Sequence, residues 1–159
     1  MGSGTILREV EAAVALLNDD WSVAADVWSI TSANELRRDG LACQRWNMLH
    51  PEETPKVPYI TEQLKDTEGP FIAATDYMKL YTDQLRPYVP GRFNVLGTDG
   101  FGRSDTRAKL RHFFEVNRYF IVISALSALV DEAKLDPSVI KQALKKYGIS
   151  ADKVDPTTV

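Results

Sequence analysis

The chain has 159 residues and a formal net charge of −3, with 44% hydrophobic and 26% charged residues. This composition fits one soluble globular domain. The acidic balance argues against a nucleic-acid partner, because such proteins usually carry a basic stripe. A single cysteine, Cys43, excludes an internal disulfide and favours a reducing compartment. The longest apolar run, residues 119–129, is too short to span a bilayer, so we expect no membrane partner.

Helical and strand patterns alternate along the chain, which predicts an α/β domain with a mostly parallel sheet. The apolar spacing predicts a first helix over residues 5–17. The inward face of this helix would carry Ile6, Val10, Ala13, Val14 and Leu17. Residues 23–30 are almost continuously apolar, which predicts a strand that is covered on both faces.

A capping box of Ser32 and Glu35 predicts a second helix from residue 33 to about residue 46. Its inward side chains would be Leu36, Gly40, Cys43 and Trp46. After a proline-rich stretch we expect a helical turn at 60–64, a strand at 71–74, a helix from about residue 76 and a third strand at 93–96. The helix from residue 76 would place Tyr77, Leu80, Tyr81, Gln84 and Leu85 on one face.

The C-terminal third reads as helical. We expect a helix over 106–115 that Ser104 or Asp105 caps, and a long apolar helix from Asn117 to about residue 133. Asp136 and Pro137 would begin the last helix, and Gly148 would end it. Residues 1–150 then form the domain, and residues 151–159 form a polar tail that we expect to be loose.

A glycine-rich segment, residues 97–105, lies between a predicted strand and a predicted helix. Backbone N–H groups at such a position can hold an anion, and two arginines could assist. The candidate residues for an anion-binding or interdomain loop are Gly97, Asp99, Gly100, Gly102, Arg103, Ser104 and Arg107. The alternative is a tight structural loop whose three glycines adopt positive φ. Asp99 and Asp105 flank Arg103, which also suggests a local ion-pair network.

No catalytic constellation is evident in the sequence. The two histidines, His50 and His112, have no His or Cys neighbour at metal-ligand spacing, and Cys43 falls on an inward helix face. We therefore predict no catalytic, cofactor-binding or metal-ligating residue in this chain.

Five stretches resemble the C-terminal region of the homodimeric bacterial pyruvate dehydrogenase family, and together they cover nearly the whole chain in order. They read GSGTILREV (2–10), DVWSITSANELRRDG (26–40), RWNMLHPEETPKVPYI (45–60), ATDYMKLYTDQLRPYVP (74–90) and VLGTDGFGRSDTRAKLRHFFEV (95–116). RWNMLHP and GTDGFGRSDTR are the most specific of these motifs, and the ending ISADKV (149–154) is also similar to that family's C-terminus.

The resemblance implies a three-layer α/β/α sandwich of the transketolase C-terminal type, with a mostly parallel sheet. It also implies that an interior strand comes just before the Gly2-Ser3-Gly4 turn, so we expect the chain to be a fragment that lacks this strand. The family's members are cytoplasmic homodimers that link glycolysis to acetyl-CoA. They decarboxylate pyruvate with thiamine diphosphate and Mg²⁺, which their other domains bind, and they acetylate the lipoyl group of dihydrolipoyl acetyltransferase within a multienzyme complex.

Three functions remain open from the sequence. The first is a structural and interaction domain that braces the dimer, shapes the approach of the lipoyl partner, contacts the remaining domains and is inactive alone. The second is a stand-alone module that binds an anion at residues 97–105. The third is the same domain of another thiamine-dependent 2-oxo-acid dehydrogenase or of a transketolase.

Overall fold

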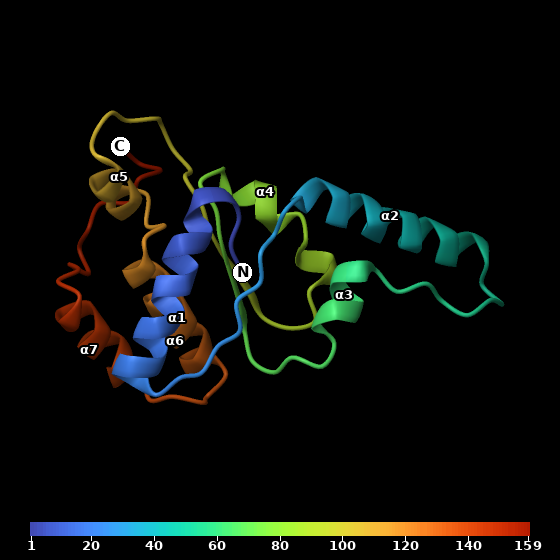
Figure 1. Cartoon of the computed structure of the whole chain (residues 1–159), viewed down its shortest axis with the longest axis horizontal. Coiled ribbons are helices and arrows are strands. Elements are labelled where there is room, and N and C mark those ends of the chain that lie inside the picture. Colours follow the sequence, from blue (N-terminus) through green and yellow to red (C-terminus); the bar gives the residue numbers. More distant parts are fainter.

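The computed structural model describes residues 1–159 as three layers, with helices on both faces of a small sheet (Figure 1). Helices α1, α6 and α7 cover one face, and α2, α3 and α4 lie on the other. The helices are α1 (Leu7–Trp21), α2 (Ala33–Leu49), α3 (Tyr59–Leu64), α4 (Lys79–Asp83), α5 (Arg107–Phe113), α6 (Arg118–Asp131) and α7 (Ser138–Lys146), with short 3-10 turns at Gly4–Ile6 and Arg86–Tyr88. The three-layer α/β/α prediction is confirmed.

The sheet contains two parallel strands, β1 (Phe71–Ala74) and β2 (Phe93–Leu96), which begin and end where the sequence predicted. Successive side chains of a strand point to opposite faces. Accordingly Phe71 and Ala73 join one core cluster, whereas Ile72 and Ala74 contact the other. This alternation explains why β1 is apolar at every position.

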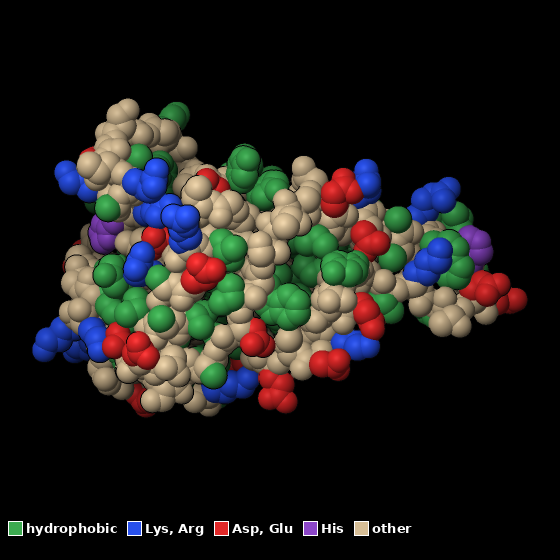
Figure 2. Space-filling view, in the orientation of Figure 1, with side chains coloured by type: hydrophobic (Ala, Val, Ile, Leu, Met, Phe, Trp, Pro, Cys, Tyr) green, Lys and Arg blue, Asp and Glu red, His purple; other side chains and the backbone are tan.

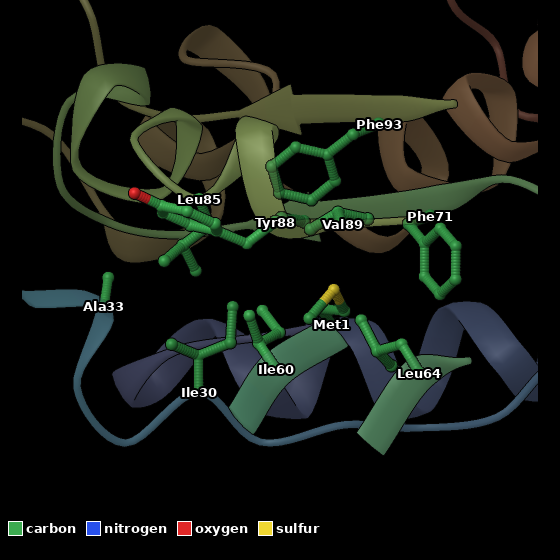
Figure 3. Packing of buried hydrophobic residues seen from close by; sticks show 11 residues of the cluster. Met1, Ile30, Ala33, Ile60, Leu64, Phe71, Leu85, Tyr88, Val89 and Phe93 are labelled. Carbon is green, nitrogen blue, oxygen red and sulfur yellow. The ribbon is translucent and has the colours of Figure 1, made fainter. Parts of the chain in front are cut away.

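Two core clusters of similar size hold the layers together. Figure 3 shows the first, in which Ile30 and Ala33 meet Ile60 and Leu64 beneath the sheet and the 85–93 segment. The second joins α1 to α6 and α7 through Ile6, Val10, Ala13, Leu17, Val122 and Leu126. Four of the five inward residues predicted for the first helix are therefore buried; Val14 is half-buried.

Residues 1–3 occupy the interior position that the resemblance assigned to a strand. Gly2 forms parallel bridges to Ala74 on one side and to Ser29 on the other. The Gly2 N–H donates to the Trp28 carbonyl at 2.9 Å, and the Ser3 N–H donates to the Ala74 carbonyl at 3.2 Å. A mostly apolar cavity of about 170 Å³ adjoins Met1 and is lined by residues 23–26, residues 67–72 and side chains of α1 and α6.

The predicted strand over residues 23–30 is wrong, because only Ser29 forms a bridge and residues 24–27 are exposed. A strand needs a hydrogen-bonding neighbour along its length. Residues 1–3 supply such a neighbour only near Ser29, so the rest of this apolar stretch runs as an extended connection.

The face predicted for the helix from residue 76 is only partly correct, since Leu85 is buried and Tyr81 packs against the first core cluster. Helix α4 has only five residues, and Tyr77 and Leu80 are 60% and 67% exposed. Thr82, which the prediction left off this face, is buried. The short helix and the following 3-10 turn change the periodicity on which the prediction relied.

The capping predictions are mostly confirmed. The Ser32 hydroxyl accepts from the Glu35 N–H, Asn117 accepts from the N–H groups of Tyr119 and Phe120, and Gly148 has a φ of 64°. Helix α5 differs, because its N-cap is Thr106 and not Ser104 or Asp105. Helix α7 begins one position later than predicted, with Pro137 as its N-cap, although Asp136 Oδ1 accepts from the Ser138 N–H.

By length and composition alone, the helical stretch Arg107–Asp131 could cross a membrane. In the fold it comprises α5 and α6, which are separated by residues 114–117. Within this stretch, α6 packs against α1, α7 and β1 and contributes to the second core cluster, whereas α5 has no buried residue.

Candidate functional site

The loop of residues 97–105 follows β2 and leads into α5, at the carboxyl end of the parallel strands. Open α/β sheets commonly bind ligands at this edge. The first half of the loop instead packs against the start of α4 and forms a hydrogen bond with it. Asp99 Oδ1 accepts from the Lys79 N–H at 2.9 Å, and a Cβ on Gly97 would lie 2.7 Å from the Tyr77 carbonyl oxygen and the Lys79 nitrogen. Gly97 is therefore required for close packing.

The C-terminal tail packs on the middle of this loop. Gly100 has a φ of 102°, and a Cβ there would lie 2.4 Å from the Pro156 carbonyl oxygen. Lys153 Nζ donates to the Phe113 carbonyl at 2.9 Å and to Glu115 Oε1 at 3.0 Å. The expectation of a loose tail is therefore wrong, because these contacts anchor it and bury Pro156.

The structural-loop alternative, in which all three glycines adopt positive φ, holds at only one of them. Gly100 alone adopts the positive φ that we expected of all three, and Gly97 is confined by neighbouring backbone. Gly102 has neither feature, since a Cβ there would meet nothing within 4 Å. The loop up to residue 100 is thus a packing element.

The predicted ion-pair network around Arg103 is wrong. The Arg103 guanidinium lies over the Phe113 ring, 4.6 Å from its centroid, and forms no ion pair with either aspartate. Asp105 accepts from the Thr106 N–H at 2.7 Å and lies 3.7 Å from Lys109 Nζ. Ser104 and Arg107 are exposed, so both remain accessible to a partner.

A cluster that the sequence analysis missed lies beside this loop. Glu9 on α1 is buried and pairs with Arg111 of α5 at 2.8 Å and with Arg118 of α6 at 3.0 Å. Burial raises the pKa of the Glu9 carboxyl, but the hydrogen bonds and charges of Arg118 and Arg111 outweigh burial and hold this pKa below its ordinary value. In the sequence, Glu9 directly precedes Val10, which lies on the predicted apolar face of the first helix. This position could have indicated that the Glu9 carboxylate is buried.

Both histidines contact aromatic rings, and the cysteine lies in the interior. His50 stacks on Trp46 with 4.5 Å between ring centroids, and His112 lies 5.6 Å from the Phe120 ring. Cys43 is buried, and burial raises the pKa of its thiol. No group of three or more His, Cys, Asp or Glu side chains in the chain could hold a metal ion.

Helix α2 projects from the body of the domain as an arm (Figure 1). It exposes apolar side chains. The exposed apolar residues of α2 and of the segment that follows it are Leu41, Met48, Leu49, Val57 and Tyr59. Met48 is the most exposed of these, at 72%. Contiguous exposed apolar surface usually marks an interaction site.

Comparison with known proteins identifies this architecture. The family model described as the transketolase-like TK C-terminal domain matches residues 1–117. The chain belongs to this family. The match ends before α6, yet α6 and α7 complete the second core of this transketolase-like C-terminal domain.

Curated relatives match the domain over its whole length. The pyruvate dehydrogenase E1 components of Pseudomonas aeruginosa and Escherichia coli K12 are 57% and 52% identical over 157 residues, which is 98% of this chain. That of Cupriavidus necator is 51% identical over 159 residues, which is 100% of this chain. In each case the chain spans 18% of the relative's length.

Proposed function

We propose that this domain is the C-terminal part of a pyruvate dehydrogenase E1 component that decarboxylates pyruvate and reductively acetylates the lipoyl group of dihydrolipoyl acetyltransferase. The observation that carries the proposal is the identity of 57% to the Pseudomonas aeruginosa protein over 98% of the chain. The relatives reported above share this name, which favours it over a transketolase or another 2-oxo-acid dehydrogenase.

The residues of the domain do not fit the cofactors of that reaction. Mg²⁺ takes oxygen ligands in octahedral geometry, usually including one or two carboxylates. The chain contains no metal-holding group of His, Cys, Asp and Glu, and its buried carboxylate, Glu9, is already paired with two arginines. In the proposed enzyme, thiamine diphosphate and Mg²⁺ are held by the other domains, and no chemical step is assigned to residues of this one.

The role of the domain in the enzyme is to brace a cytoplasmic homodimer and to shape the approach of the lipoyl partner. The apolar arm supports this role, because Leu41, Met48 and Leu49 are exposed on a helix that extends away from the core. Exposure of such residues is costly in water unless another surface covers them.

The enzyme assignment is tested with the full-length protein, thiamine diphosphate, Mg²⁺ and a lipoylated acetyltransferase domain. Acetylation of the lipoyl group with pyruvate, and at least about a hundredfold lower kcat/KM with 2-oxoglutarate, is the expected result. Equal or greater activity with another 2-oxo acid, or with a sugar phosphate, would refute the assignment.

A further inference from the structure

Basic side chains gather on one face of the domain, over α5 and the start of α1 (Figure 2). We define the arginine face as Arg8, Arg103, Arg107, Arg111 and Arg118. These residues come from α1, the 97–105 loop, α5 and α6, so the fold brings together charges that are distant in sequence. The concentration is notable in a chain whose net charge is −3.

Three hollows adjoin one another on this face, and Arg107 and Arg111 line all of them. Arg103 contributes to the first hollow, Arg118 to the second and Arg8 to the third. Their volumes are 510, 470 and 520 Å³. Each far exceeds the roughly 30 Å³ of one water molecule, so the surface suits an extended partner better than one small ion.

Three of the five arginines on this face have no ion-pair partner within the domain. Glu9 pairs with both Arg111 and Arg118, so its single negative charge offsets only one of their two positive charges. No carboxylate lies within 4.0 Å of the guanidinium of Arg8, Arg103 or Arg107. The other carboxylates that line the hollows are Glu11, Asp76 and Asp105. Asp105 is already engaged with Lys109.

Glu9 also orders part of the arginine face before any partner binds. It holds Arg111, whose side chain is only 18% exposed, in one orientation at the junction of the hollows. A guanidinium that is already ordered loses less conformational entropy when a partner binds. Arginine suits this task better than lysine because its planar fork can bind a carboxylate through two hydrogen bonds.

We propose that the arginine face docks an acidic segment of the remaining polypeptide of the same enzyme, within one subunit or across the dimer. This inference rests on the proposed function. The chain spans 18% of its relatives, so most of such an enzyme lies outside it and must contact some face of this domain. Phe101, which is 80% exposed in the same loop, adds the pairing of arginine with an aromatic residue that is typical of protein interfaces.

The first test uses the full-length enzyme with Arg107→Lys, which retains the positive charge and supplies an amine for zero-length carbodiimide coupling to carboxylates. Mass spectrometry of the coupled protein should show residue 107 joined to an Asp- or Glu-containing peptide outside residues 1–159. Exposed Lys141 on α7, which has no ion-pair partner, reports the background reactivity. Coupling of residue 107 only within residues 1–159, or no more often than Lys141, overturns the proposal.

The second test compares Arg8→Ala/Arg107→Ala with Lys141→Ala/Lys145→Ala in the full-length enzyme. Amide exchange across residues 107–113 should accelerate about tenfold in the arginine variant alone. An equal rate in both variants contradicts docking at this face. Tight binding of inorganic phosphate that depends on Arg107, without coupling to any peptide, assigns the face to a small anion and also overturns the proposal. The pyruvate assay on the unaltered enzyme is independent, so its failure would refute only the enzyme assignment.

Discussion

Glu9 and Arg118 are joined by three hydrogen bonds. Glu9 Oε2 accepts from the backbone N–H and the Nε of Arg118, each at 3.0 Å, and Glu9 Oε1 accepts from Nη2 at 3.2 Å. The start of α6 is thereby fixed to the first turns of α1. Because Glu9 also binds Arg111, one buried carboxylate positions three helices and the arginine face.

Replacing Glu9 with Gln should lower the free energy of unfolding of residues 1–159 by about 1–3 kcal/mol. Glutamine keeps the size of the side chain but removes the charge, and its amide N–H groups face the donors of Arg111 and Arg118. Urea unfolding measures the difference. The matched control is Glu62→Gln, which removes an exposed pair with Lys65 and should cost at most about 1 kcal/mol. Similar losses in the two variants would show that the Glu9 cluster has no special role.

The same carboxylate should make stability depend on pH in the acidic range. The pKa of Glu9 lies below its ordinary value of 4.5 in the folded chain. Its stabilising contribution is therefore complete above pH 4.5 and is lost as the pH falls through the folded pKa. The difference in unfolding free energy between the wild-type chain and Glu9→Gln should shrink as the pH is lowered from 6 to 3. A difference that stays constant over this range would contradict the pairing.

Gly100→Ala should destabilise residues 1–159 by about 1–3 kcal/mol, because alanine must adopt a positive φ and clashes with Pro156. It should also release the tail, so that amide exchange at residues 150–158 accelerates. Gly102→Ala is the matched control in the same loop, since its Cβ meets nothing within 4 Å. It should change stability by no more than about 0.5 kcal/mol. Unchanged tail exchange in Gly100→Ala would mean that the loop and the tail are not coupled.

Met48→Ser should separate folding from assembly. Because Met48 is 72% exposed, the unfolding free energy of residues 1–159 should change by no more than about 0.5 kcal/mol. In the full-length enzyme the dimer dissociation constant, measured by analytical ultracentrifugation, should rise about tenfold. Val159→Ser, at a terminal position that is 48% exposed, should leave it unchanged. If both variants assemble like the wild-type enzyme, the arm is not an assembly surface.

The sequence predicted the elements whose signals are local. Strands β1 and β2 and the caps at Ser32 and Asn117 depend on short-range patterns, and all four are confirmed. The stretch 23–30 has the same apolar composition as a buried strand, but whether it pairs depends on residues 1–3, which are distant in sequence. Local composition contains no information on such a partner.

The candidate site shows the same limit. The glycine-rich motif correctly indicated a constrained loop, but the tail contact at Gly100 joins residues more than fifty positions apart. Glu9 was visible as a carboxylate beside apolar Val10, whereas its partners Arg111 and Arg118 follow only from the packing of α1 on α5 and α6. Long-range ion pairs therefore required the three-dimensional structure.

The most direct test of the bracing role compares the full-length enzyme with a truncated version from which this domain, residues 1–159, has been removed. Sedimentation at graded protein concentrations and the steady-state rate of lipoyl acetylation should be measured on both proteins. We predict that the truncated protein dissociates at concentrations at which the full-length enzyme remains dimeric, and that its activity falls together with the dimer fraction. A truncated protein that stays dimeric and retains the full acetylation rate would contradict a bracing role for this domain.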